Sequence, residues 1–147
     1  MIHPKELSTL AHITLETINK LYEQGYRTFL SGGALGFDTL AARQVIKYRE
    51  QHPDLKLKMI LPCRTQSNRW TDSQKKTYAD LLSKSDDVLF LSDQYYDGCM
   101  LMRNRYMVVH SSICICYLKN RKGGTWYTVA YALKKGLDIQ NLALRML

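Results

Sequence analysis

The sequence predicts a three-layer α/β domain built on a mostly parallel sheet. Helical patterns alternate with short apolar runs along all 147 residues. Most of these runs are continuously apolar, as expected for parallel strands that are covered on both faces. A chain of this length suits a single hydrophobic core, so we expect residues 1–147 to form one domain.

The predicted helices follow from the spacing of apolar side chains and from their end signals. Apolar residues recur at i, i+3 and i+4 over residues 5–24, and Gly25 follows where a helix-ending glycine belongs. A second helix cannot continue past Pro53, and Thr71-Asp72-Ser73 can cap a third. The helices after the first are expected over residues 37–51, 71–83, 101–110 and 125–135.

Five apolar runs predict strands, and they cover residues 27–30, 55–61, 87–91, 113–118 and 139–142. The polar stretch Cys63–Trp70, after the second run, is too rich in Arg, Asn, Gln and Ser to belong to the core. The chain opens with a helix, whereas folds of this class usually begin with a strand. The usual first strand is therefore predicted to be missing.

The composition limits the kinds of molecule that the protein is expected to bind. The chain carries 21 Lys and Arg against 13 Asp and Glu, a formal charge of +8, which favours anionic partners from a small phosphorylated ligand to nucleic acid. No apolar run approaches the roughly 18 to 20 residues that span a bilayer, and the N-terminus lacks a signal-peptide layout. We therefore expect a cytoplasmic protein that does not bind membranes.

The four cysteines invite a disulfide or metal interpretation, but no CxxC pair is present. Two of them stand two residues apart in one apolar run, which is poor disulfide geometry and leaves a metal without further ligands. We expect buried free thiols and no metal site. The four are Cys63, Cys99, Cys114 and Cys116.

A glycine-rich turn follows the first predicted strand and leads into a helix. Glycines there let a phosphate approach the bare main chain, and the helix N-terminus supplies unpaired N–H donors and partial positive charge. The alternative is that these glycines serve steric needs only. The turn reads Ser31-Gly32-Gly33-Ala34-Leu35-Gly36-Phe37-Asp38.

Asp38 is not expected to contact a phosphate, because two negative charges repel. Two interpretations stay open: its carboxylate stabilises the first helical turn, or it accepts hydrogen bonds from ribose hydroxyls.

A second glycine turn, Lys122-Gly123-Gly124-Thr125, joins another apolar strand to a helix. Both turns should lie at the carboxyl edge of the sheet, where ligands bind in parallel α/β folds. Three cations, Lys119, Arg121 and Lys122, flank this turn. Thr125 is placed to act as helix N-cap or as a hydroxyl donor to a phosphate.

These motifs resemble those of a known superfamily. Ser31-Gly32-Gly33-Ala34-x-Gly36-x-Asp38 is similar to the first motif of the SLOG superfamily, which includes the DprA/Smf and LOG proteins. An Arg-Asn-rich segment followed by a Gly-Gly-Thr turn resembles its YpsA-like branch. That segment is Leu101-Met102-Arg103-Asn104-Arg105-Tyr106-Met107-Val108.

The resemblance implies a Rossmann-like fold and a pocket for a nucleotide or its derivative, with NAD- or ADP-ribose-like molecules favoured. No cofactor is implied beyond such a ligand. LOG relatives that cleave nucleotides carry a Glu three residues after the second turn, where this chain has Thr128. No carboxylate occurs between Thr125 and Leu137, so the general acid/base group is missing. We expect a sensor, regulator or sequesterer; nucleotide hydrolysis and DprA-like nucleic-acid binding are the alternatives.

The sequence departs from the branch at two places. YpsA-like proteins usually begin with a strand ending in a Thr-Gly-His-Arg-Pro-like turn, where this chain has only Ile2-His3-Pro4. The branch also tends to carry aspartates where this chain has Val109 and Ser112. Either the pocket is altered, or a neighbour in a homo-oligomer completes it.

Other side chains are candidates for direct contact. Arg103 and Asn104 open a helix, and Arg103 could clamp a phosphate; the alternative is a surface arginine beside a packing asparagine. Arg64, Trp70 and Tyr95 stand in loops at the same expected edge, where they could contact or stack a base or simply pack onto their own domain. No Ser-His-Asp, HExxH or Walker A arrangement is present, so no catalytic residue is assigned.

Overall fold

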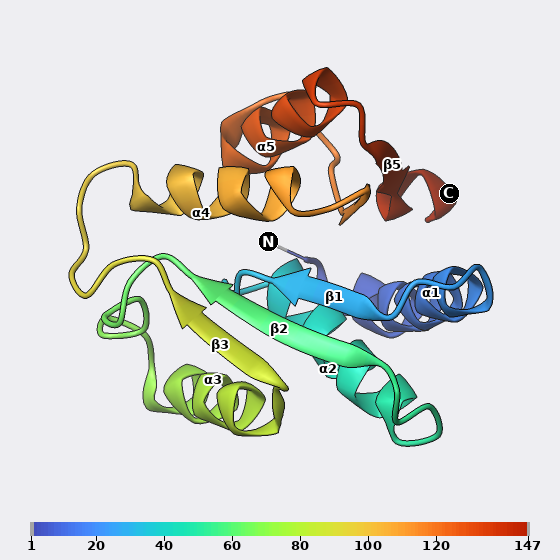
Figure 1. Cartoon of the computed structure of the whole chain (residues 1–147), viewed down its shortest axis with the longest axis horizontal. Coiled ribbons are helices and arrows are strands. Elements are labelled where there is room, and N and C mark those ends of the chain that lie inside the picture. Colours follow the sequence, from blue (N-terminus) through green and yellow to red (C-terminus); the bar gives the residue numbers. More distant parts are fainter. Residues whose placement is uncertain (1, 147) are drawn as a thin grey trace.

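The computed structural model describes residues 2–146 and confirms a parallel α/β fold in which helices and strands alternate (Figure 1). The α-helices are α1 (Pro4–Glu23), α2 (Phe37–Arg49), α3 (Asp72–Lys84), α4 (Cys99–Val109) and α5 (Gly123–Lys134). The strands are β1 (Thr28–Ser31), β2 (Lys56–Leu61), β3 (Asp87–Phe90), β4 (Ile113–Cys116) and β5 (Asp138–Asn141). A 3-10 turn, η1 (Leu142–Arg145), follows β5.

The predicted elements are confirmed, with shifts of a few residues at their ends. Helix α2 and strand β4 end two residues earlier than predicted, and helices α4 and α5 begin two residues earlier than predicted. Each starts at a glycine with positive φ: Gly98 at +89° before α4, and Gly123 at +86° as the first residue of α5. Lys122 is therefore the N-cap of α5, and the prediction that Thr125 caps this helix is wrong.

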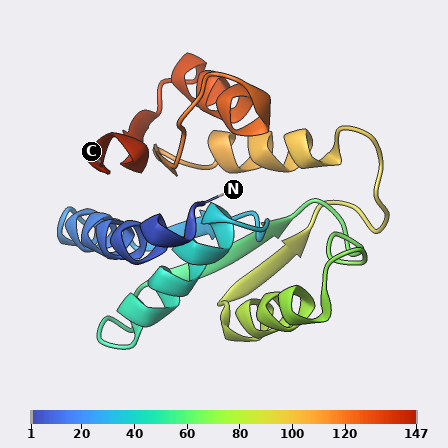
Figure 2. The same cartoon turned by 180° about the vertical axis from the view of Figure 1, so that it is seen from behind.

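The strands form two sheets instead of the one predicted. One has the order β1-β2-β3 and the other β4-β5, with every pairing parallel. Phe29 pairs with Leu57, and Cys114 pairs with Ile139. Within residues 2–146, β1 and β4 each have a single strand neighbour. Figures 1 and 2 show the consequence: α4, α5 and β5 form one half of the molecule, and the β1–β3 sheet lies in the other.

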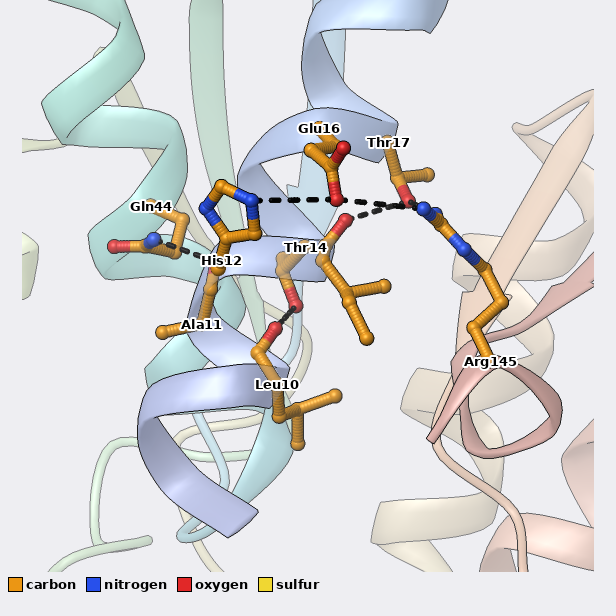
Figure 3. Close-up of polar contacts among 9 residues, drawn as sticks. Leu10, Ala11, His12, Thr14, Glu16, Thr17, Gln44 and Arg145 are labelled. Carbon is orange, nitrogen blue, oxygen red and sulfur yellow. Dashed lines mark hydrogen bonds and ion pairs between the residues drawn. The ribbon is translucent and has the colours of Figure 1, made fainter. Parts of the chain in front are cut away.

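Helix α1 ties the two halves together (Figure 3). On one side, the Gln44 side chain of α2 donates to the carbonyl of Ala11 at 2.7 Å. On the other, Arg145 of η1 donates to Thr17 Oγ1 at 3.1 Å and pairs with Glu16 at 3.4 Å. The helix thus lies along both halves and fixes their separation.

The larger core surrounds β2. Leu57, Met59 and Leu61 are fully buried there, and they pack with side chains from α1, α2 and α3. A smaller core joins Leu10 and Ile13 of α1 to Leu142 of η1. The fold is therefore centred on β2, and the β4–β5 sheet has the lesser share of buried apolar surface.

The four cysteines match their predicted character in part. The four cysteines are free thiols; Cys63, Cys99 and Cys116 are buried, and Cys114 is half-buried. Residues 2–146 contain no group of His, Cys, Asp and Glu side chains arranged to hold a metal. In the same range, no helix is both long and apolar enough to cross a membrane.

The first prediction concerns the core. Leu57→Ala should destabilise the protein by about 2–5 kcal/mol, because it leaves a cavity beside fully buried neighbours. Leu144→Ala, at a position that is 71% exposed, should change stability by no more than about 0.5 kcal/mol. Urea unfolding of the two variants measures both values. Equal losses would contradict the placement of the core.

Candidate ligand site at the carboxyl edge

The first glycine turn is closed by its own side chains. Gly33 has φ +66°, and a Cβ there would lie 3.0 Å from Leu61 Cδ2 and 3.1 Å from Met59 Cε. Ser31 Oγ accepts from Gly33 N–H, and the Asp38 carboxylate accepts from Ala34 N–H, both at 3.3 Å. These two N–H groups are therefore occupied, and Gly33 has a steric reason to be glycine.

Gly32 is required by the approach of Arg103. The Arg103 guanidinium donates through Nη1 to the carbonyl of Gly32, and a Cβ on Gly32 would lie 2.5 Å from that nitrogen. Arg103 is 3% exposed, so it is not the surface residue of the alternative interpretation. The guanidinium is therefore buried behind the turn, where it contacts backbone and side-chain groups of the protein.

Gln66 completes the surroundings of Arg103. Its Oε1 accepts from Arg103 Nη1 at 3.3 Å, and its Nε2 lies within 3.4 Å of the oxygen atoms of Gly32 and Tyr78. The prediction that residues 63–70 lie outside the core is wrong here, because Gln66 and Cys63 are buried. No sequence signal marks Gln66, since its partners come from distant parts of the chain.

A continuous path of hydrogen bonds joins the two glycine turns. From Gly32, Arg103 Nε donates onward to Asn104 Oδ1 at 2.8 Å. Asn104 Nδ2 then donates to Thr128 Oγ1 at 2.9 Å, and that hydroxyl donates to the carbonyl of Gly124 at 3.1 Å. Arg103 and Asn104 thereby connect the end of β1 with the start of α5.

The Asp38 carboxylate interacts electrostatically with Arg103, which belongs to this path. Burial raises its pKa, and the opposing effects are the Arg103 charge and hydrogen bonds from the N–H groups of Ala34 and Gly32. Burial likewise lowers the pKa of Arg103, while the Asp38 charge opposes that change. From the first turn of α2, the Asp38 carboxylate thus holds the preceding glycine turn through Ala34 N–H.

The second glycine turn is open. Residues 121–125 are exposed, and no side chain caps the start of α5. A Cβ on Gly124 would meet no atom within 4 Å, and Gly124, unlike Gly123, lacks a positive φ. Within residues 2–146, neither crowding nor backbone conformation thus requires a glycine at this position.

The three cations beside the second turn differ in their surroundings. Lys119 pairs with Glu6 at 2.8 Å and so is directed toward the start of α1. Arg121 lies over the Trp126 ring, with its Cζ 5.5 Å from the ring centre. Lys122 makes no ion pair with the described residues and is exposed next to the turn.

The candidate loop residues do not gather at one point. Arg64 pairs with Asp93 at 2.9 Å and lies over the Phe90 ring. Trp70 packs edge-on against Tyr78, at 5.1 Å between ring centres, and belongs to the margin of the core. Tyr95 is 60% exposed. Of the three, Arg64 and Tyr95 present most of their side chains to solvent, whereas Trp70 does not.

A cavity of about 460 Å³ lies between the two halves and reaches this edge. At the carboxyl ends of the strands, the cavity is lined by residues of the first glycine turn and of the hydrogen-bond path. These polar lining residues are Ser31, Gly32, Asp38, Asn104 and Thr128. The site therefore has a buried, fixed floor and an exposed N-terminus of α5 beside it.

Parallel strands, glycine turns that follow β1 and β4, and a cavity lined by both of these strands define a Rossmann-like α/β protein. The chain belongs to the YspA SLOG family, whose sequence profile matches residues 3–147, so the predicted resemblance is confirmed. It is 31% identical over 123 residues to a UPF0398 protein of Halalkalibacterium halodurans, covering 82% of this chain and 65% of that relative.

Two further relatives have similar identities. The uncharacterized SPbeta prophage-derived protein YoqJ of Bacillus subtilis is 29% identical over 130 residues, which cover 80% of this chain and 75% of YoqJ. A UPF0398 protein of Bacillus cereus is 28% identical over 122 residues, which cover 81% of this chain and 66% of the relative. The chain thus spans just under two thirds of the UPF0398 proteins that it matches.

The second prediction tests the Arg103 contacts. Arg103→Lys should destabilise the protein by about 2 kcal/mol or more. A lysine ammonium lacks the forked geometry of the guanidinium and cannot donate hydrogen bonds to Gly32, Gln66 and Asn104 at the same time. The matched Arg105→Lys, at an exposed position on the same helix, should stay within about 0.5 kcal/mol. Chemical denaturation compares them. An undisturbed Arg103→Lys variant would contradict a positioning role.

The third prediction concerns pH. Because the native state raises the pKa of Asp38 above its ordinary value of 3.8, its contribution to stability is greatest below that value and is lost as pH rises through the native pKa. Wild type should therefore lose stability relative to Asp38→Asn as the pH rises from about 4 to 7. Urea midpoints across this range measure the difference.

Asp86 provides a control of opposite sign. Burial acts to raise its pKa, but hydrogen bonds from Leu57 N–H and Arg49, with the Arg49 charge, hold the pKa below its ordinary value. The contribution of Asp86 to stability is present above pH 3.8 and is lost as the pH falls through the native pKa. The stability of the wild type relative to Asp86→Asn should therefore increase as the pH rises from the acid range. The same slope for both variants would refute this assignment.

Proposed function

We propose that this protein binds a phosphorylated, nucleotide-derived ligand at the carboxyl edge and holds it without cleaving it. The single observation that carries the proposal is Gly124. A glycine near the start of a helix costs stability relative to alanine, and the surroundings of Gly124 give no steric reason for it. Close approach of a ligand to the bare main chain would supply that reason.

The electrostatics of the second turn support an anionic group there. The N–H groups at the start of α5 have no side-chain cap, and the first turn of this helix has no acidic residue. The helix dipole and the exposed Lys122 both add positive potential. We assign the phosphate to Gly123, Gly124 and Thr125, with the Thr125 hydroxyl as an additional donor.

The first turn plays a different part in this proposal. Since the N–H groups of Gly33 and Ala34 are already taken by Ser31 and Asp38, this turn forms the wall of the pocket and supplies fewer free donors. Arg103 acts from behind it as a positioning residue. Asp38 lines the cavity, so one carboxylate oxygen is available to a ribose hydroxyl while the other accepts from Ala34.

The residue at position 128 supports retention without cleavage. Thr128 lines the cavity at the position where LOG nucleotide hydrolases carry Glu, and its hydroxyl is engaged with Asn104 and Gly124. Aliphatic hydroxyl groups, whose pKa lies far above neutral pH, do not serve as general acids for an N-glycosidic bond. A sensor, a regulator or a sequestering protein would need only binding.

The fourth prediction uses a matched pair at Gly124. Gly124→Asp places a carboxylate at the proposed phosphate, while Gly124→Asn has nearly the same shape without the charge, and the open surroundings accept both. With ADP-ribose, NAD and mononucleotides as probes, calorimetry should show that Asp weakens binding at least about tenfold more than Asn.

Three results would overturn the proposal. None of the probes binds the wild type; or Asp and Asn variants bind equally; or free base accumulates during incubation with mononucleotides, which would make the protein a hydrolase. Binding that falls steeply with salt and is unaffected by either substitution would instead favour nucleic acid as the partner.

A further inference from the structure

The half of the molecule that contains α4, β4 and α5 carries almost all of the chain's excess positive charge. Residues 98–137 include seven of the 21 Lys and Arg residues and none of the 13 Asp and Glu residues. The rest of the chain is close to neutral, with 14 Lys and Arg against 13 Asp and Glu. Since α4 and α5 lie together in one half (Figures 1 and 2), the positive potential is concentrated on one side of the protein.

Five of these seven cations are directed to solvent. The other two are Arg103, which is buried, and Lys119, which pairs with Glu6 of α1. All five are exposed, and none takes part in an ion pair within residues 2–146. The five are Arg105, Arg121, Lys122, Lys134 and Lys135.

Helix α4 presents two apolar side chains and one arginine on its outer side. Met102, Arg105 and Val109 stand at positions i, i+3 and i+7, a spacing that places them on one face of a helix. All three are exposed, and Met102 and Val109 each have at least half of their surface accessible to solvent. Two large apolar side chains therefore flank a charged one on a helix face that residues 2–146 leave uncovered.

Helix α5 extends this face with aromatic side chains. Arg105 donates to the Tyr127 hydroxyl, and its Cζ lies 5.6 Å from the centre of the Tyr127 ring and 5.3 Å from that of the Tyr131 ring. Lys135 Nζ lies 5.5 Å from the centre of the Tyr131 ring. Cation–π attraction thus holds Arg105 at the seam between the two helices. The α4–α5 face is the surface formed by Met102, Arg105, Val109, Tyr127, Tyr131 and Lys135.

The side chains of the α4–α5 face fit a protein partner better than a nucleic acid. Tyr, Met and Arg are enriched at the centres of protein–protein interfaces. Each of the two Tyr rings already has a cation of the chain beside it, which makes the rings less available to stacked bases. A sugar–phosphate backbone would contact the cations but would leave Met102 and Val109 exposed. An apolar side chain of a protein can cover both.

The charge of the face favours a partner with carboxylates. Asp or Glu side chains placed against Arg105 and Lys135 would form charge-assisted hydrogen bonds with groups that have no acidic neighbour along residues 98–137. A symmetric contact between two copies through this face would bring cations against cations, because the same segment offers no carboxylate in return. A different protein fits this face better than a second copy.

We infer that the α4–α5 face docks a different protein, through a segment of that protein that combines carboxylates with at least one large apolar side chain. The apolar side chain covers Met102 and Val109, and the carboxylates pair with Arg105 and Lys135. This inference does not depend on the proposed ligand, because the charge and the apolar surface of the face belong to the chain itself.

The test uses phage-displayed random dodecapeptides as the probe and the whole chain as the target. The library is selected on the wild type, and the most enriched peptide is synthesised with a fluorescein label for anisotropy titrations. Two variants alter the face: Arg105→Glu reverses its charge, and Met102→Gln removes apolar surface while keeping the length of the side chain. Arg43→Glu is the matched charge control, at an exposed arginine of α2 that makes no ion pair within residues 2–146.

The enriched peptides should have a net negative charge and at least one large apolar residue. Arg105→Glu should weaken binding of the labelled peptide at least about tenfold and Met102→Gln at least about threefold, whereas Arg43→Glu should change it by less than about twofold. All three positions are exposed, so the urea midpoints of the variants should stay close to that of the wild type.

Any of four results would contradict the inference. The first is that no peptide, or no peptide with a net negative charge, is enriched. The second is that Arg105→Glu and Arg43→Glu weaken binding equally, or that Met102→Gln leaves it unchanged. The third is tighter, Arg105-dependent binding of labelled oligothymidylate or of phosphatidylserine vesicles, which would make a nucleic acid or a membrane the occupant. The fourth is a dimer of the wild type that Arg105→Glu abolishes, which would make a second copy the occupant.

Discussion

The buried guanidinium of Arg103 is the interaction on which the rest of the site depends. It is 3% exposed and spans the division between the two halves, since it extends from α4 to the carbonyl of Gly32 at the end of β1. Burying a cation in a protein is unfavourable unless acceptors surround it. Gly32, Gln66 and Asn104 provide those acceptors, and the Asp38 charge provides the compensating field.

This arrangement explains residue choices that otherwise look unrelated. Gly32 must lack a Cβ because the guanidinium occupies that space. Asn104 relays the contact to Thr128 and thus to Gly124, so the first glycine turn and the start of α5 are held in one frame. The two turns follow strands of different sheets, and this path holds them together in addition to α1 and the smaller core.

The elements of the fold could be predicted from the sequence because they are local. The spacing of apolar side chains and the flanking glycines predict α1, and the run of apolar residues ending at Pro62 predicts β2. The division of the sheet could not be predicted, since strand pairing depends on partners distant along the chain. The start of α5 could not be predicted from the sequence, because it depends on the left-handed backbone of Gly123.

The position of the candidate site could be predicted from the sequence, but its hydrogen-bond network could not. The first glycine turn lines the cavity at the carboxyl ends of the strands, and the second turn lies beside it. The positions of both turns after strands indicate this arrangement. The direction of Arg103 could not be foreseen, because its acceptor on Gly32 is 71 residues away and the apolar residues of α4 lie on all sides of the helix, so they mark no single inner face. Gln66 was missed for the same reason: a glutamine in a polar stretch becomes interior only through distant partners.

The central claim is that the two turns form one anion site, held together by Arg103 and open at Gly124. An NMR titration with ADP-ribose, following backbone amides and the Arg103 Nε–H, tests it most directly. We predict the largest saturable shifts at Gly123, Gly124 and Thr125, with the Arg103 signal changing along the same binding curve. Shifts scattered over the basic surface, or a silent Gly123–Thr125 segment at saturation, would contradict the account.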